Sequence, residues 1–233
     1  MRKPAMTDTP LLLSIGILGG TGKEGQGLAY RWAKAGYRVL IGSRSEEKAV
    51  TSAGKISELL DGASSIVGTS NQNAAKMAEL VVVTVPYSAH RETLELVKGE
   101  LQGKLLIDVT VPLVPPKVTA AQMPPAGSAA QEAKEILGAG VEVAAAFHNV
   151  SHEHLLKDDI IDCDVLVTGS SLNARSETLK LVESAGLIGW DAGPLENSMV
   201  LEGLTSVLIN INKKYGSTHA GIRITGASRD RTG

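Results

Sequence analysis

The sequence from Leu11 to Lys34 is LLLSIGILGGTGKEGQGLAYRWAK, an apolar run followed by a glycine-rich turn and a longer amphipathic stretch. The apolar run predicts a buried strand at Leu11–Gly19, and the spacing of apolar side chains after the turn predicts a helix at Lys23–Lys34. The turn between them, from Gly20 to Gly25, has the spacing G-x-G-x-x-G. A strand, this turn and a helix in that order predict the first part of a Rossmann-type βαβ unit.

The alternation of short apolar runs and helical stretches continues to Leu137. A run such as Val81–Val83 is apolar on both faces, as in a strand covered by helices on both sides. Strands joined by crossover helices predict an α/β fold, a doubly wound and mostly parallel Rossmann-type sheet. The further expected strands are Tyr37–Gly42, Ser64–Gly68, Leu80–Val85 and Lys104–Asp108, and the further expected helices are Glu46–Leu60, Asn73–Met77, Ala89–Lys98 and Ser128–Leu137.

A proline-rich segment separates this first part from the rest of the chain. Val109–Gly127 contains five of the nine prolines and predicts a loop over one end of the sheet. After it we expect strands at Val141–Phe147, Cys163–Thr168 and Leu187–Trp190 and helices at Leu172–Ala185 and Leu195–Tyr215. We therefore expect a nucleotide-binding domain over residues 11–140 and a small C-terminal α/β extension over 141–225, with a disordered tail at 1–10 and a second tail at 226–233.

Composition limits the partners of this chain. Its 233 residues carry 23 basic and 25 acidic side chains, a net charge of −2. Because no basic run stands out, we expect no nucleic-acid partner and no membrane-surface patch, and a small molecule as ligand. The single cysteine, Cys163, forms no disulfide framework and no thiolate cluster for a metal, which favours a reducing cytoplasm. The apolar run Leu11–Leu18 is too short for a signal or membrane segment.

The glycine turn predicts a dinucleotide site. Gly20 would make the tight turn, Gly22 would let backbone N–H groups reach a pyrophosphate, and Gly25 would allow the helix to pack closely on the strand. The start of the helix adds its partial positive charge. A purely structural turn without a ligand is the alternative interpretation.

The end of the second strand distinguishes the two nicotinamide cofactors. An NAD-binding site would place a carboxylate there, on the ribose 2′-hydroxyl. This chain has Ser43 and Arg44 instead, with Lys48 one helical turn further on, and a guanidinium suits a phosphomonoester. We therefore predict NADP(H) as cofactor, with these three side chains at the 2′-phosphate. In the alternative interpretation, Arg44 and Lys48 are solvated charges that pair with Glu46 or Glu47.

Six segments together resemble a known family. The chain is similar to the NADP-dependent reductases of the deazaflavin coenzyme F420, over about residues 14–224. The Asp191–Asn197 segment, DAGPLEN, is the longest and most unusual of the shared runs. The segments are Ile17–Gly22, Gly42–Lys48, Thr84–Pro86, Phe147–Val150, Asp191–Asn197 and Leu208–Asn210.

The resemblance implies an oxidoreductase that moves a hydride reversibly between NADP(H) and coenzyme F420. Such a transfer needs two rings held face to face in a dry slot, with no nucleophile and no metal. We therefore expect the enzyme to catalyse the transfer by positioning the two rings. His148 is the candidate hydrogen-bond partner of the deazaflavin. The implied ligand contacts are Thr21, Gly22, Lys23 and Glu24 at the pyrophosphate, Ser43, Arg44 and Lys48 at the 2′-phosphate, Val85 and Val111 along the path to the nicotinamide, His148 and Val150 at the deazaflavin, and Ala220 over the nicotinamide end.

Other interpretations stay open at this point. His148, His152 and His154 form the pattern H-x-x-x-H-x-H, but no other ligand-type cluster supports a metal site. The apolar stripe Leu201, Leu204, Leu208 and Ile211 of the last helix fits either core packing or a homodimer face. The competing functions are an NADPH-dependent flavin or ferric reductase module and a sensor that binds NADP(H) without turnover.

Overall fold

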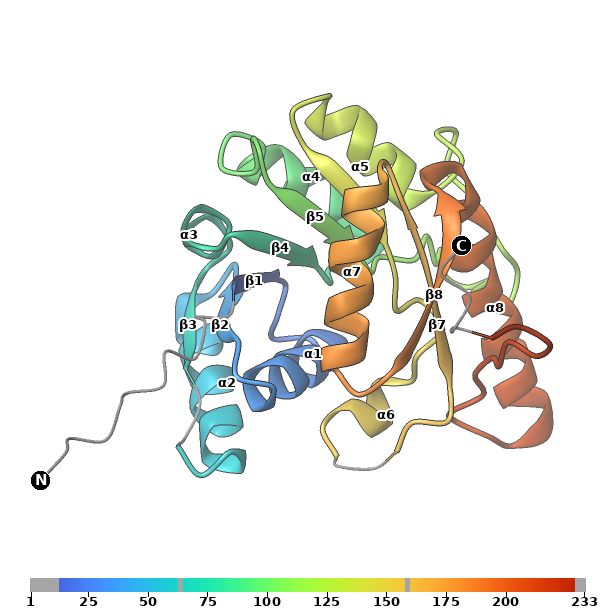
Figure 1. Cartoon of the computed structure of the whole chain (residues 1–233), viewed down its shortest axis with the longest axis horizontal. Helices are drawn as coiled ribbons and strands as arrows, with labels where there is room; N and C mark the ends of the chain where they lie inside the picture. Colours follow the sequence, from blue (N-terminus) through green and yellow to red (C-terminus); the bar gives the residue numbers. More distant parts are fainter. Residues whose placement is uncertain (1–12, 63–64, 158–159, 229–233) are drawn as a thin grey trace, which may run out of the picture.

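The computed structural model describes residues 13–62, 65–157 and 160–228 (Figure 1). In this part of the chain eight strands form one sheet in the order β3-β2-β1-β4-β5-β6-β7-β8. Every neighbouring pair is parallel except β6 and β7, which are antiparallel. The strands are β1 Ser14–Leu18, β2 Arg38–Ser43, β3 Ile66–Ser70, β4 Leu80–Val83, β5 Leu105–Asp108, β6 Glu142–Ala145, β7 Asp164–Gly169 and β8 Ile188–Pro194.

Helices cover both faces of this sheet. One face packs on α1, α2 and α7 and the other on α3, α4 and α5. Val82 of β4 belongs to the first core, whereas Val81 and Val83 belong to the second, which explains why this strand is apolar at every position. The helices are α1 Lys23–Lys34, α2 Glu46–Leu59, α3 Asn71–Met77, α4 Tyr87–Val97, α5 Ala129–Leu137, α6 His152–Leu155, α7 Leu172–Ser184 and α8 Ser198–Tyr215.

The predicted fold class, a Rossmann-type α/β sheet, is confirmed, and the differences are local. The expected last helix begins with a 3-10 turn at Leu195–Asn197 and becomes α-helical at Ser198. Helix α6 was not predicted, because four residues are too few for a periodic signal. The last strand runs on to Pro194, which pairs with Gly169 of β7 after a shift in register. In the last helix, Leu201 and Leu208 are buried and therefore belong to the core.

Some expectations fall outside the described residues or stay untested. Residues 1–12, with the expected tail and the first two residues of the expected strand, lie outside, as do Ser64 and residues 229–233. The division near residue 140 stays a prediction, although β6 pairs with β5 and so continues the same sheet. Among the described helices, none has the length and apolar character needed to cross a membrane.

Two features of the sheet position the site. The strand order reverses at β1, which lies between β2 and β4, and ligands of open α/β sheets bind at such a switch point. The second feature is the pairing of β6 with β7, in which Ala145 lies opposite Thr168. Because this pair is antiparallel, Asp164–Val167 project beyond the carboxyl end of β6. This overhang, the projecting wall, stays paired with β8.

Candidate active site

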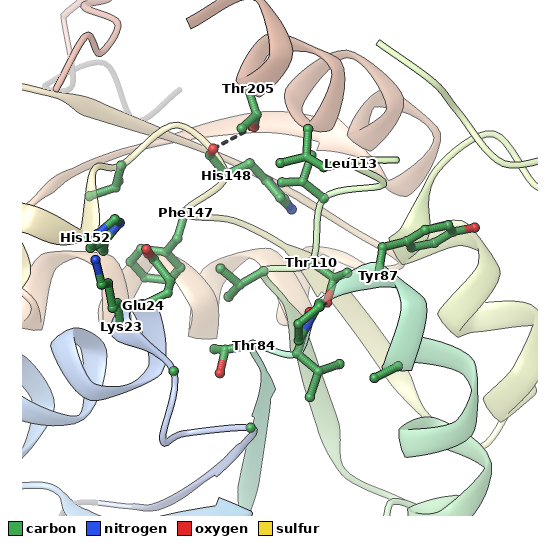
Figure 2. A pocket seen from close by; sticks show the side chains of 18 of the residues that line it. Lys23, Glu24, Thr84, Tyr87, Thr110, Leu113, Phe147, His148, His152 and Thr205 are labelled. Atoms are coloured by element: carbon green, nitrogen blue, oxygen red, sulfur yellow. Dashed lines mark hydrogen bonds between the residues drawn. The ribbon is translucent and has the colours of Figure 1, made fainter. Parts of the chain in front are cut away.

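A cavity of about 870 Å³ opens at the carboxyl ends of β1, β2, β4 and β5 (Figure 2). Its floor includes the loops after β4 and β5, and its far side is formed by the segment after β6 and by α8. Every predicted contact residue except Gly20 lines it: Thr21, Gly22, Lys23, Glu24, Ser43, Arg44, Lys48, Val85, Val111, His148, Val150 and Ala220. The structure therefore brings together residues that are far apart in the sequence.

The glycine turn follows β1 and leads into α1. The Gly20 N–H donates to the Gly42 carbonyl at 3.0 Å, so Gly20 closes the turn from behind rather than lining the cavity. A Cβ on Gly25 would lie 2.7 Å from both the Gly20 Cα and the Thr84 Oγ1, so close packing requires a glycine there. A Cβ on Gly22 would meet only the Gly19 carbonyl, at 3.4 Å. The space in front of Gly22 is thus open to a ligand.

The sequence interpretation missed Gly19. Its φ of +71° is a left-handed conformation that favours glycine, and its N–H donates to the Asn71 side chain at 3.2 Å. Its Cβ would collide with Val85, whose Cγ1 would lie at 2.6 Å. A spacing pattern that begins at Gly20 could not reveal this first residue of the turn.

Ser43, Arg44 and Lys48 lie together at the other end of the cavity, where β2 ends and α2 begins. The Ser45 hydroxyl caps α2 by accepting from the Lys48 N–H at 3.4 Å. Within the described chain, neither the Arg44 guanidinium nor the Lys48 ammonium forms an ion pair, although both line the cavity. Glu46 instead accepts from the Thr69 hydroxyl at 3.2 Å. The alternative pairing with nearby glutamates is therefore not what the structure contains.

His148 follows β6 and projects into the cavity opposite Thr84 and Thr110. Its side chain is buried, and neither ring nitrogen has a hydrogen-bond partner. Burial lowers the pKa of His148 to about 4, so the ring is neutral at pH 7, with one nitrogen as donor and the other as acceptor. An unpartnered donor and acceptor in a cavity wall suit a ligand that has polar ring edges.

Two contacts hold His148 in this position. The preceding residue, Phe147, has a φ of +69°, which is costly for a residue with a side chain. Its ring is buried and packs edge-on against Trp32, with 5.8 Å between the ring centroids. The His148 carbonyl accepts from the Thr205 hydroxyl of α8 at 2.7 Å (Figure 2). Neither the left-handed backbone nor the contact with α8 could be predicted from the sequence.

A buried histidine–aspartate pair fixes the floor. The Asp108 carboxylate at the end of β5 lies 2.7 Å from the Nε2 of His90 on α4, and both side chains are fully buried. Asp108 also accepts from the Thr110 N–H at 2.9 Å, and the Thr110 hydroxyl donates to the Val85 carbonyl at 3.3 Å. Burial disfavours the charged ring of His90, but the Asp108 carboxylate outweighs it and raises the pKa of His90. The loops after β4 and β5 are thereby tied together.

The segment after α8 closes the remaining side. The Ala220 N–H donates to the Asn212 side chain at 2.9 Å, and the Thr218 carbonyl accepts from the Ser151 hydroxyl at 3.1 Å. Ile222 pairs with the start of the projecting wall, since its carbonyl accepts from the Asp164 N–H at 2.8 Å. This return of the chain explains how Ala220 comes to line the cavity.

A metal centre is not supported by the described residues, which contain no group of three His, Cys, Asp or Glu side chains able to hold an ion. His154 lies edge-on to His219, with 5.0 Å between the ring centroids. Cys163 is buried and accepts from the Asn149 amide at 3.1 Å, as expected of a core residue.

The sequence matches that span nearly the whole chain belong to one family. Residues 14–112 match the family model described as NADP oxidoreductase coenzyme F420-dependent. The F420-dependent NADP reductase of Methanocaldococcus jannaschii is 39% identical over 221 residues, which cover 91% of this chain and 98% of that protein. The F420-dependent NADP reductase of Methanothermobacter marburgensis is 41% identical over 222 residues, with the same coverage of 91% and 98%.

Solved structures share the fold. A candidate F420-dependent NADP reductase from Arthrobacter sp. FB24 has a TM-score of 0.77 at 22% identity and covers 92% of this chain and all of its own. An imine reductase from Myxococcus stipitatus has a TM-score of 0.58 at 19% identity, and the match covers 88% of this chain but 62% of that one. The rest of the imine reductase chain lies outside the match.

Proposed function

The chain belongs to the F420-dependent NADP reductases, and we propose that its cavity holds NADP(H) and coenzyme F420 side by side for direct hydride transfer. A reduced nicotinamide supplies the hydride and an oxidised deazaflavin ring accepts it, or the reverse. The enzyme is an oxidoreductase for which these two small molecules are the partners. The observation that carries the proposal is the single cavity that joins the glycine turn to the buried, unpartnered His148.

The NADP(H) half extends over the carboxyl ends of β1 and β2. Backbone N–H groups of α1 bind the diphosphate, because Gly22 begins that helix without a side-chain cap. Ser43, Arg44 and Lys48 bind the 2′-phosphate. The lack of internal ion pairs for the two cations within the described chain supports this assignment, because their charges stay available to a dianion.

The deazaflavin half lies against the segment after β6. His148 donates or accepts a hydrogen bond at the ring edge, and Val150 contacts the ring system. Ala220 lies over the nicotinamide end. Val85 and Val111 are the apolar side of the slot between the two ligands and exclude water from it. The side chains thus act by binding and orientation, and no residue of this site has to form a covalent bond or abstract a proton from carbon.

One assay tests this function. Oxidised coenzyme F420 and NADPH are mixed with the purified protein, and the absorbance of the deazaflavin chromophore is followed. We expect it to fall with NADPH and to fall much more slowly with NADH. Binding of NADPH without any loss of absorbance would support a sensor instead, and reduction of flavin mononucleotide in preference to F420 would support a flavin reductase.

The assembly and location of the enzyme are also proposals. Val200 and Val207 of α8 are 66% and 50% exposed, which is consistent with a homodimer face, and light scattering of the purified protein tests it. The single described cysteine is buried and forms no disulfide, which is consistent with a cytoplasmic enzyme.

A further inference from the structure

Glu24 is an acidic side chain where an anionic ligand is expected. It lies in the first turn of α1 and lines the cavity directly beside Gly22. Its Oε1 atom is sealed from solvent and has no hydrogen-bond partner. The Glu24 side chain as a whole is half-buried, but a sealed carboxylate oxygen without a partner is costly, and it costs less when the group is a carboxylic acid. Burial accordingly raises the pKa of Glu24 to about 8.

No charged side chain compensates Glu24. Its pKa rises through burial alone, without a contribution from any cation or anion. The positive charge of Lys23 acts on Glu153 instead, where it helps to lower the pKa of that carboxyl group, which the Thr218 hydroxyl already lowers. The other titratable and charged groups on α1 and on the elements packed against it are Lys23, Arg31 and Lys34 of α1, Arg38 of β2 and Arg44 after it, Glu46, Glu47, Lys48, Lys55 and Glu58 of α2, His152, Glu153 and His154 of α6, and Arg175, Glu177, Lys180 and Glu183 of α7.

The start of α1 offers a place for a diphosphate. No side chain caps this helix, so its first backbone N–H groups are free to bind an anion. A phosphate oxygen bound there would lie next to the Glu24 side chain, which belongs to the same first turn of the helix. An ionised Glu24 would repel this phosphate oxygen. A protonated Glu24 would donate a hydrogen bond to it, in addition to those from the backbone N–H groups. The protonation state of one side chain thus decides between repulsion and a hydrogen bond.

Resting on the proposed function, we propose that Glu24 binds the diphosphate of NADP(H) as a carboxylic acid, so that nucleotide binding is coupled to one proton. The carboxyl O–H donates to a phosphate oxygen, and the proton stays on Glu24. Raising the pH removes this proton from the free enzyme and weakens binding. NADPH binding in turn draws a proton from solution whenever Glu24 is ionised.

The magnitude follows from the ionisation of the free enzyme. With a pKa of about 8, Glu24 is protonated in most molecules at pH 7 and in about one of eleven at pH 9. The dissociation constant for NADPH should therefore rise about tenfold between pH 7 and pH 9. At pH 8, binding should take up about half a proton per NADPH.

The matched control is Glu24→Gln, which keeps the size and a hydrogen-bond donor but cannot ionise. We expect its dissociation constant for NADPH to change less than twofold over the same pH range. The matched ligand is 2′-AMP, which reaches the Ser43 and Arg44 corner but has no diphosphate. Its binding to the wild-type protein should take up no proton at pH 8, as measured by calorimetry in buffers of different ionisation enthalpy.

The outcomes separate this inference from the proposed function. If NADPH binds and reduces coenzyme F420 but wild type and Glu24→Gln have the same pH dependence, the inference is wrong and the function stands. If NADPH does not bind at any pH, the function itself is wrong. Should Glu24→Gln fail to fold, the proton uptake of the wild type decides: uptake with NADPH and none with 2′-AMP supports the inference, and equal uptake with both refutes it.

Discussion

Replacing Gly22 with alanine should weaken NADPH binding and leave the fold intact, whereas replacing Gly25 with alanine should destabilise the fold. Both residues belong to the same glycine turn. They differ in what an added methyl group would meet. At Gly22 it meets the Gly19 carbonyl at 3.4 Å, an ordinary contact. At Gly25 it meets two atoms at 2.7 Å, one of which belongs to the backbone.

The structure sets the expected magnitudes. Gly22 has a φ of −71° and a ψ of 163°, an extended conformation that alanine adopts readily, so the melting temperature should change by roughly 2 °C or less. If its methyl group moves the diphosphate away from one backbone N–H, about 1.5–3 kcal/mol of binding is lost. NADPH then binds about tenfold to a hundredfold more weakly. Overpacking at Gly25 should lower the free energy of unfolding by roughly 1–3 kcal/mol.

Thermal melting without ligand and titration with NADPH measure the two effects separately. The reasoning predicts that Gly22→Ala melts with the wild type but binds NADPH poorly, and that Gly25→Ala melts early. Wild-type affinity in Gly22→Ala would mean that no ligand occupies the open space beside that residue. Equal destabilisation of both variants would mean that the turn is a structural device with no ligand.

Three further predictions concern single side chains. Arg44→Ala should weaken NADPH binding about tenfold to a hundredfold, from the loss of a charge-assisted contact of about 1.5–3 kcal/mol, with little effect on NADH; an unchanged preference between the two cofactors would refute the 2′-phosphate assignment. His148→Ala should raise the KM for coenzyme F420 or lower kcat in steady-state assays, and wild-type values of both would exclude His148 from the deazaflavin site. Glu202 is buried, and burial together with the negative charge of Asp108 raises the pKa of its carboxyl group to about 8. Because the folded protein holds the carboxyl proton more tightly than the unfolded chain does, the free energy of unfolding should decrease from pH 5 to pH 8. Thermal melts of Glu202→Gln should show a smaller decrease over that range, and an identical decrease in wild type and variant would exclude Glu202 as a source.

Features encoded over short stretches of sequence could be predicted. The helix Lys23–Lys34 and the apolar strand Leu80–Val83 follow from local periodicity, and the structure places them within a few residues of the expected bounds. Likewise, Gly25 and Arg44 belong to patterns whose residues are close in the sequence. The structure places Gly25 in the turn after β1 and Arg44 just after β2, and the ligand contacts that the patterns predict there stay predictions.

Features that depend on contacts over long sequence separations could not be predicted. The left-handed backbone of Phe147 is held by packing on Trp32, more than a hundred positions earlier in the chain. The pair of His90 and Asp108 depends on the distance between a helix and the end of a strand. The protonation of Glu24 depends on how completely the surrounding residues exclude water, and no spacing of residue types records that.

The antiparallel register of β6 and β7 lets the length of the projecting wall be changed without reversing its two faces. Since Ala145 pairs with Thr168, the height of the projecting wall equals the overshoot of Asp164–Val167. Each residue of a strand adds roughly 3.3 Å, and side chains alternate between the two faces. Adding or removing residues in pairs at this overhang would therefore extend or trim the wall in steps of roughly 7 Å without turning its inner face outward.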